Sequence, residues 1–205
     1  MFCLSIANVA CAQEASFQPI FDGESFAGWE GDTDKTWRIE DGTITVGSHD
    51  VPAPHNDFLA TTKEFKNFEL RLKFKVTGDQ DVNAGVQFRT KRIPNHYEVS
   101  GFQADISPEY DGHLYDESRR RKFLAQPNDA TMKKAQAAVA DDGWTTYRIR
   151  AQENRIQLWF NGVQTVDYTE TDPKIEKSGI IALQIHAKMK ALIAYKDIEI
   201  LELPD

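Results

Sequence analysis

The chain has 205 residues, of which 40% are apolar and 11% aromatic, so it can form a sizeable core and is not disordered throughout. Its 32 acidic and 24 basic side chains give a formal charge of −8, which disfavours non-specific binding to nucleic acid or to anionic membranes. The length favours a single domain. No apolar run reaches the roughly 20 residues of a spanning helix. We therefore expect no nucleic-acid partner and no transmembrane segment.

The first twelve residues predict a cleaved export signal. They carry no charged side chain and end in Ala10-Cys11-Ala12, with small residues where a signal peptidase needs them. The front lacks the usual Lys or Arg, which fits a truncated or misassigned start. A frayed N-terminal strand and a lipid-modified Cys11 are the alternatives. The only other cysteine is Cys3, so residues 13–205 form one domain without thiol chemistry, expected in the periplasm or secreted.

Alternation with a period of two dominates the rest of the chain. Between Phe68 and Val76, apolar residues alternate with Glu, Arg and Lys, which predicts a strand with one buried face and one solvent face. Two dipeptides, Asp41-Gly42 and Asn161-Gly162, separate pairs of such runs and predict tight hairpins, because these residues accept the positive φ angles of two-residue turns.

The remaining pattern predicts an all-β fold. Residues 129–140 are rich in Ala and Lys and predict one short surface helix, placed between strands. About ten short strands with one helix indicate a sandwich of two antiparallel sheets. Further strands are expected at 58–61, 84–89, 97–106, 144–151, 179–186 and 191–203.

Three of these strands carry polar residues that are unusual for a solvent face. Spacing of i, i+2 places each pair on one side of its strand. Short amides, a carboxylate, a guanidinium and an imidazole are typical of a polar pocket, although each pair could simply bond a neighbouring loop. If the strands share a sheet, the pairs line one surface: Gln87 with Arg89, Gln103 with Asp105, and Gln184 with His186.

The segment after residue 106, expected to be a loop, concentrates opposite charges beside an aromatic ring. Planar guanidinium groups bind carboxylates and sugar hydroxyls, so we expect a substrate-binding role; a solvated, internally paired loop is the alternative. The candidates are Tyr115, Asp116, Glu117, Arg119 and Arg120. No zinc-protease motif, calcium loop, glycine-rich phosphate loop or serine-nucleophile elbow occurs in the sequence. The four tryptophans are interpreted mainly as core residues.

A series of motifs resembles one family in order and spacing. The motifs are FDGESFAGW at 21–29, WRIEDGTI at 37–44, FELRLKFKV at 68–76, NAGVQFR at 83–89, YEVSGFQADI at 97–106, GHLYDESRR at 112–120, the run 144–170 and GIIALQIHA at 179–187. Together they resemble the 3-keto-disaccharide hydrolase domain family of bacterial secreted or periplasmic proteins. Ala84 and Ala187 stand where the family often has Ser and Gly, and these replacements could alter the conformation of a loop or the shape of the pocket floor.

The resemblance implies a concanavalin A-like jelly roll with a carbohydrate site on its concave face. It also implies an oxidised, 3-keto di- or oligosaccharide or glycoside as partner. A ketone at carbon 3 acidifies the proton at carbon 2, so a base can form an enolate that expels the group at carbon 1. This hydrolase or lyase route differs from that of ordinary glycosidases.

The chemistry assigns roles to the polar pairs. His186 is the first choice as base, since imidazole titrates near working pH. Asp105 is the second choice, as base or acid, and Arg89 could stabilise the enolate. Gln87, Gln103, Gln184 and Tyr115 would bind substrate. A divalent metal ion is chemically sensible as a Lewis acid, with His186, Asp105 and Glu98 as candidate ligands.

Two other classes of function stay open. A non-catalytic carbohydrate-binding module needs aromatic platforms and amides but not an imidazole with a carboxylate, and fold alone does not confer function. The chain could also be a structural domain of a larger secreted assembly, with its polar pairs serving only packing.

Overall fold

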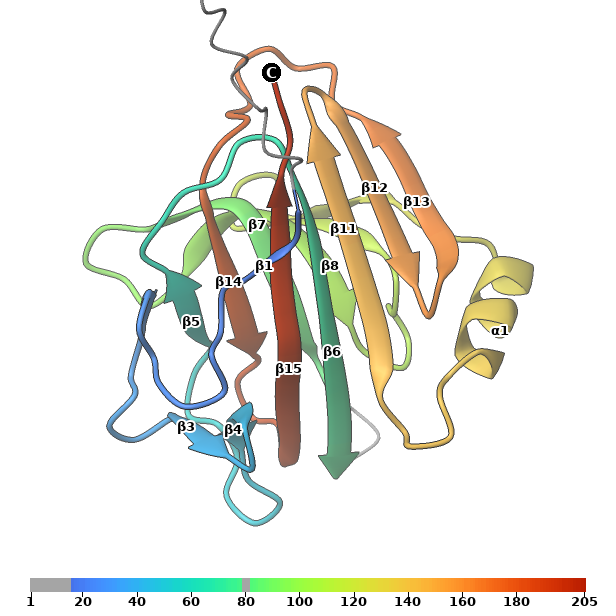
Figure 1. Cartoon of the computed structure of the whole chain (residues 1–205). Helices are drawn as coiled ribbons and strands as arrows, with labels where there is room; N and C mark the ends of the chain where they lie inside the picture. Colours follow the sequence, from blue (N-terminus) through green and yellow to red (C-terminus); the bar gives the residue numbers. More distant parts are fainter. Residues whose placement is uncertain (1–15, 79–81) are drawn as a thin grey trace, which may run out of the picture.

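A computed structural model describes residues 16–78 and 82–205 as two antiparallel sheets packed face to face (Figure 1). The signal predicted over residues 1–12 lies outside the described residues. Sheet A has the order β13-β12-β11-β6-β15-β4-β3, and β1 pairs with β15. Its strands are β1 (Gln18–Pro19), β3 (Trp37–Glu40), β4 (Thr43–Gly47), β6 (Phe68–Gly78), β11 (Thr145–Gln152), β12 (Arg155–Phe160), β13 (Val163–Thr169) and β15 (Ala191–Glu202).

Sheet B has the order β10-β9-β8-β7-β14-β5-β2 and lies behind sheet A in Figure 1. The predicted jelly-roll sandwich is therefore confirmed. Strands that are distant in sequence pair within each sheet, such as β6 with β15 and β7 with β14. The strands of sheet B are β2 (Trp29–Glu30), β5 (Asp57–Thr61), β7 (Ala84–Arg92), β8 (Val99–Ile106), β9 (Leu114–Glu117), β10 (Lys122–Ala125) and β14 (Ile180–Ile185).

Both predicted hairpins form at the expected dipeptides. Asp41 and Gly42 have φ angles of 50° and 73°, and Asn161 and Gly162 have φ angles of 48° and 74°. Two successive positive φ angles match the right-handed twist of the strands that the turn joins. The turns thus fix the register of β3 with β4 and of β12 with β13.

The helix α1 (Asp129–Ala137) lies at the side of the sandwich next to β13, as Figure 1 shows. The Asn128 side chain caps its first turn by accepting a hydrogen bond from the Thr131 N–H. Only Ala135 among its residues is buried. The helix ends three residues earlier than the composition predicts. Met132 and Ala135 pack on the core, but Val139 beyond the helix is exposed, so no packing holds the last residues in the helix.

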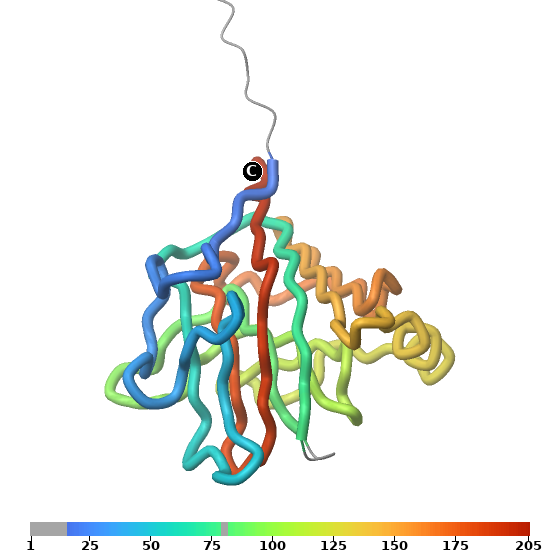
Figure 2. The backbone as a smooth tube through the Cα atoms, turned by 60° about the horizontal axis from the view of Figure 1, so that its bottom comes forward, coloured from blue at the N-terminus to red at the C-terminus, as the bar shows by residue number. Residues whose placement is uncertain are grey.

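The inner faces of the two sheets form one continuous core of aromatic and aliphatic side chains. Phe68, Leu70, Leu72 and Phe74 of β6 are at most 4% exposed, as their alternation predicts. The first strand, β1, pairs with the last strand, β15, so the two ends of the described chain lie close together. Figure 2 shows these two ends at the same end of the molecule. No helix of the described residues is long and apolar enough to cross a membrane.

One part of the fold differs from the prediction. The segment after residue 106 was expected to be a loop, but it contains β9 and β10, which extend sheet B at its edge. Each strand has only four residues, and a charged turn separates them. Such short strands show too few alternations to be detected by periodicity.

Candidate functional site

The outer face of sheet B carries polar side chains that are nevertheless buried. In β7 and β8 the residues Ala84, Val86, Phe102 and Ala104 face the core, so the residues between them point outward. These outward residues have little contact with solvent: Gln87 is fully buried, Gln103 is 3% exposed and Asp105 is 5% exposed. A solvent face of a strand would not show such burial, so this surface is covered by neighbouring segments of the chain.

A hollow of about 330 Å³ opens on this face. Its volume falls at the lower end of the range of about 300–1,000 Å³ found for small-molecule sites. Side chains from strands of sheet B and from the segments that connect them converge on it. The lining residues are Asn56, Asn83, Gln103, Asp105, Tyr110, Tyr115, Glu117, Phe123, Gln184 and His186.

The floor of the hollow is shaped by Gly85. In the cross-strand register Gly85 of β7 lies between Gln184 of β14 and Asp105 of β8. Two strand spacings separate Gln184 from Asp105 by about 10 Å, and the glycine leaves this interval without a side chain. A Cβ atom on Gly85 would lie 2.8 Å from the Gln103 side chain, so glycine also gives the Gln103 amide its place.

Asp105 is a carboxyl group that burial keeps protonated. Burial raises the pKa of Asp105 to about 8, against the opposing effect of a hydrogen bond from Gln103 Nε2 to its Oδ1. Gln103 in turn accepts a hydrogen bond from the Gln87 amide. The three side chains form a chain of hydrogen bonds across β7 and β8 that fixes the orientation of the carboxyl group. At neutral pH Asp105 can therefore donate a proton.

His186 directly follows the last residue of β14 and lines the same hollow. Its Nδ1 lies 3.1 Å from the Ala187 carbonyl oxygen, which can only accept, so in the neutral ring Nδ1 carries the hydrogen and Nε2 the lone pair. Asn56 holds this segment from the side: its Oδ1 accepts from the Ala187 N–H at 2.9 Å, and its Nδ2 donates to Glu98 Oε1 at 2.8 Å. The imidazole is thus arranged to act as a proton acceptor.

Gln184 is fully buried, yet neither its Oε1 nor its Nε2 has a hydrogen-bond partner among the described residues. Leaving a buried amide unpaired costs about 1–3 kcal/mol per group. The Nε2 donor and the Oε1 acceptor side by side suit a hydroxyl group, which donates to Oε1, next to a second hydroxyl or carbonyl oxygen, which accepts from Nε2. This side chain is therefore the best candidate in the hollow to recognise a polar ligand.

Tyr115 and Glu117 of β9 form one wall of the hollow. Burial raises the pKa of both groups, and the nearby Glu98 carboxylate raises that of Glu117 further. Tyr115 therefore presents a hydroxyl donor. Its ring packs edge-on against Phe123, with centroids 5.2 Å apart, which gives the wall an apolar surface.

Arg89 does not reach the hollow, contrary to the expectation that it shares a face with Gln87. Its φ angle is 46°, and the pairing with β8 shifts between Phe88 and Lys91, so a β-bulge turns the side chain to the other face. The guanidinium donates to the Lys66 and Glu153 carbonyl oxygens at 2.7–2.9 Å. Arg89 therefore connects sheet B to the ends of sheet A strands.

Three charged candidates of the segment after residue 106 also lie away from the hollow. Asp116 is fully buried on the inner side of β9 and is paired with Arg119 and Arg120. Arg120 also binds Glu170 just beyond β13 at 2.7 Å, and Arg119 stacks on the core residue Phe102 at 4.6 Å. The alternative of an internally paired segment thus describes these residues, which tie the two sheets together.

The candidate metal ligands only partly come together. Residues 16–78 and 82–205 contain no group of three His, Cys, Asp or Glu side chains arranged to hold a metal ion. Glu98 lies behind Asn56 rather than among the lining residues, and its Oε2 is buried without a partner among the described residues. Asp105 and His186 therefore share the hollow, while Glu98 lies outside it and contacts Asn56.

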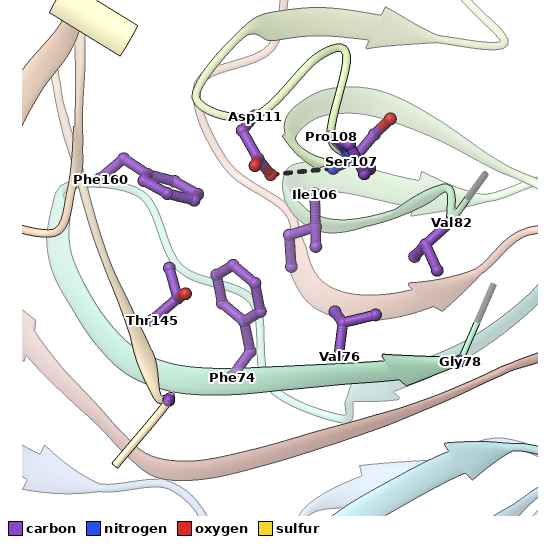
Figure 3. A pocket seen from close by; sticks show the side chains of 11 residues that line it. Phe74, Val76, Gly78, Val82, Ile106, Ser107, Pro108, Asp111, Thr145 and Phe160 are labelled. Carbon is purple, nitrogen blue, oxygen red and sulfur yellow. Dashed lines mark hydrogen bonds between the residues drawn. The ribbon is translucent and has the colours of Figure 1, made fainter. Parts of the chain in front are cut away.

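A second cavity, of about 260 Å³, lies between the two sheets and is shown in Figure 3. Its walls combine the apolar side chains of Phe74, Ile106 and Phe160 with polar groups, and the carboxyl group of Asp111 points into it. Asp111 Oδ1 accepts from the Ser107 N–H at 3.0 Å, and burial raises its pKa to about 7. The turn from Ser107 to Asp111 thus separates this cavity from the hollow on sheet B, to which it contributes Tyr110.

Sequence reasoning missed four lining residues: Asn56, Asn83, Tyr110 and Phe123. Asn56, Asn83 and Tyr110 stand outside the strands, where alternation gives no information about side-chain direction. Signals did exist, because Asn83 begins the quoted motif NAGVQFR and Tyr110 lies in the segment rich in charges. Phe123 belongs to β10, a strand too short to detect.

Two solved structures with a similar fold have carbohydrate-related names. A "putative glycosyl hydrolase" from Parabacteroides distasonis has a TM-score of 0.65 at 15% identity, over 92% of this chain and 94% of that one. The carbohydrate-binding module CBM66 from Bacillus subtilis has a TM-score of 0.63 at 12% identity, over 85% and 96%. Both likenesses concern the fold. No curated protein sequence matches the chain.

The class is thus that of carbohydrate-related jelly-roll proteins. Within it, the chain belongs to the family of the 3-keto-alpha-glucoside-1,2-lyase-like domain, which matches residues 16–201. The match covers all seven strands of sheet B and every residue that lines the hollow. The family resemblance predicted from the sequence motifs is confirmed.

Proposed function

We propose that this protein cleaves 3-keto-glycosides by removing the proton at carbon 2 and expelling the group at carbon 1. The family description names this kind of substrate. The observation that carries the proposal is the pairing, in one hollow, of a protonated carboxyl group at Asp105 with an imidazole at His186 whose Nε2 is free to accept. An elimination needs these two groups, one acid and one base.

In the proposed reaction, His186 Nε2 takes the proton from carbon 2. The electron pair of that C–H bond forms the enolate with the carbon 3 ketone, then moves to form a double bond between carbons 1 and 2. The C1–O bond breaks, and the leaving oxygen receives the proton of Asp105. The products are an unsaturated keto-sugar, to which water can add, and a free alcohol or sugar.

The enolate oxygen needs a donor in this scheme. The sequence offers Arg89 or a divalent metal ion for this role, but the Arg89 guanidinium is held by two carbonyl groups on the other side of sheet B. We assign the role to Gln184 Nε2, which has no partner among the described residues, assisted by the Tyr115 hydroxyl. Neutral donors placed at developing negative charge can contribute about 100- to 1,000-fold in rate.

The proposal extends to the location of the protein. The apolar, small-residue ending at Ala10-Cys11-Ala12 supports export to the periplasm or the medium. N-terminal sequencing of the protein recovered from its native host tests this: a chain that starts at Gln13 supports export, and an intact Met1 contradicts it.

The decisive assay compares a chromogenic α-glucoside with its 3-keto form. Selective release of the chromophore from the keto form supports the proposed enzyme. Binding of the keto form without release supports a carbohydrate-binding module instead, and neither binding nor release supports a structural domain. Catalysis of the unoxidised glucoside at an equal rate contradicts the elimination route.

A further inference from the structure

The outer face of sheet A, on the opposite side of the sandwich from the hollow, carries a groove of about 460 Å³. One wall is Trp159 of β12, and the other is formed by Asp197 and Glu199 of β15. Thr146 of β11 and Arg71 of β6 lie between them. The strand order β12-β11-β6-β15 makes the groove span three strand spacings, or about 14 Å. It is therefore longer than one sugar ring.

A β-bulge in β15 builds one wall of this groove. Tyr195 and Ile198 both face the core, at 0% and 1% exposure, so the two residues between them both point outward. The pairing of β15 with β6 shifts at this point, and Asp197 has a φ of 51°. Bulges of this kind redirect side chains at the cost of some backbone strain. Here the bulge turns the Asp197 carboxylate into the groove.

The charges of the groove balance. Arg148 donates to both oxygens of Glu69 at 2.8 Å, and Lys73 lies 2.9 Å from Asp197. A balanced surface offers no net attraction to an anion or a cation, so an uncharged ligand with many hydroxyl groups fits best. The lining contains three cations, Arg71, Lys73 and Arg148, and two carboxylates, Asp197 and Glu199. The third carboxylate is Glu69, which is paired with both arginines.

Trp159 supplies an aromatic platform at the end of the groove. The Arg148 guanidinium lies 4.1 Å from its ring centroid, and this contact holds the half-buried indole in one orientation. Because Glu69 holds Arg148 in turn, the ring is fixed before any ligand arrives. Prearranged side chains lose less conformational entropy on binding. Arg148 occupies one face of the indole, so the rest of this half-buried ring is the part that can contact the apolar face of a sugar, while the carboxylate wall suits the hydroxyl edge.

We propose that this groove is a second binding site, which takes a neutral oligosaccharide with unoxidised hydroxyl groups. It needs neither Asp105 nor His186 and does not depend on the reaction proposed above. Thr146 is the floor residue through which the site can be blocked without changing any charge.

The test uses the His186→Ala protein, so that binding is measured without turnover. Calorimetric titration with maltoheptaose, cellohexaose, mannohexaose and xylohexaose should show saturable binding to at least one of them. Trp159→Ala, which removes the platform, and Thr146→Tyr, which fills the floor, should each weaken that binding about tenfold or more. Gln152→Ala, on the same sheet face but outside the groove, should leave it unchanged.

Melting temperatures close to that of the parent protein show that each variant is folded. The proposal is overturned if none of the four oligosaccharides binds, or if binding persists undiminished in both groove variants. It is also overturned if only an anionic oligosaccharide, such as a heparin hexasaccharide, binds.

Discussion

Strands of both sheets alternate apolar residues, which face the core, with polar residues, which face outward. The outer faces of the two sheets nevertheless differ in how far their polar side chains are buried. On sheet A, Arg71 and Arg148 are 50% and 38% exposed, and water screens their ion pairs. On sheet B, Gln103 and Asp105 are at most 5% exposed, and burial raises the pKa of Asp105 to about 8. Glu69 on sheet A is buried too, but Arg148 and Arg71 lower its pKa, so the contrast comes from burial without a cationic partner and not from alternation.

Residue types indicate in part whether the polar face of a strand is exposed or buried. Lys and Arg keep their charged ends in water and suit an exposed face. Glutamine carries no charge and can be buried at lower cost, as Gln87 and Gln103 are where the Gln87 Nε2 donates to the Gln103 Oε1. A strand that alternates apolar residues with amides and a single carboxyl group therefore indicates a covered polar surface, and one that alternates with Lys and Glu indicates a solvent face.

Removing the base should have the largest effect. His186→Ala leaves no group to accept the carbon 2 proton, so turnover of a 3-keto-glucoside should fall about a thousandfold. The side chain lies beyond the end of β14 and outside the core, so the melting temperature should change little. Steady-state kinetics with the purified variant measures the effect, and unchanged turnover would remove His186 from the mechanism.

Removing the acid should have the second-largest effect. Asp105→Asn should lower kcat about a hundredfold for substrates with a poorly leaving alcohol, and less for a nitrophenol that needs no proton. In the wild type, kcat should decline as the pH rises through about 8, because Asp105 then loses its proton. Equal losses for both leaving groups would contradict the role of Asp105 as acid.

Asp105→Asn should also change how the free energy of unfolding depends on pH. The folded-state pKa of Asp105 lies above the unfolded value, so the folded protein holds this proton more tightly. The contribution to the free energy of unfolding is complete below about pH 4 and is lost as the pH rises to about 8. Asp105→Asn should therefore flatten the pH dependence of stability over this window, which denaturant unfolding at several pH values measures.

A substitution of Gly85 at the floor of the hollow should have a smaller effect on catalysis. Gly85→Ala introduces a Cβ 2.8 Å from the Gln103 side chain, which must move and release its hydrogen bond to Asp105. We expect about a tenfold loss in kcat/KM with a folded protein, since a misplaced catalytic group is costly. Wild-type kinetics in this variant would show that the chain of amides does not orient the acid.

The smallest effect on catalysis is expected at Arg89. Arg89→Ala removes the donors that satisfy the Lys66 and Glu153 carbonyl groups, which should cost about 2–4 kcal/mol of stability. The melting temperature should fall by roughly 5–15 °C. The kcat of the folded enzyme should stay within about twofold of the wild type. A large loss of kcat at unchanged stability would return Arg89 to the reaction.

Much of the architecture could be predicted because its signals are local. The alternation of β6 and the dipeptides Asp41-Gly42 and Asn161-Gly162 each specify a strand or turn on their own. The placement of Arg89 could not be predicted, since a bulge depends on how β7 pairs with β8 and breaks the i, i+2 rule without a mark in composition.

The candidate site was predictable to the extent that it lies on regular strands. Gln103, Asp105 and Gln184 follow the alternation and share one face, as expected. Asp116 also follows the alternation of β9, but it points toward the core. There it pairs with Arg119 and Arg120, which lie in the short turn after β9. Opposite charges close in sequence indicate an ion pair before they indicate a ligand.

The most direct test is a crystal structure of the Asp105→Asn variant with a bound 3-keto-glucoside. The account predicts that carbon 2 of the sugar lies within about 3.5 Å of His186 Nε2, that the glycosidic oxygen faces the amide introduced in place of the Asp105 carboxyl group, and that the ketone accepts from Gln184. A keto-sugar bound in this hollow with carbon 2 turned away from the imidazole, or bound only elsewhere on the molecule, would contradict it.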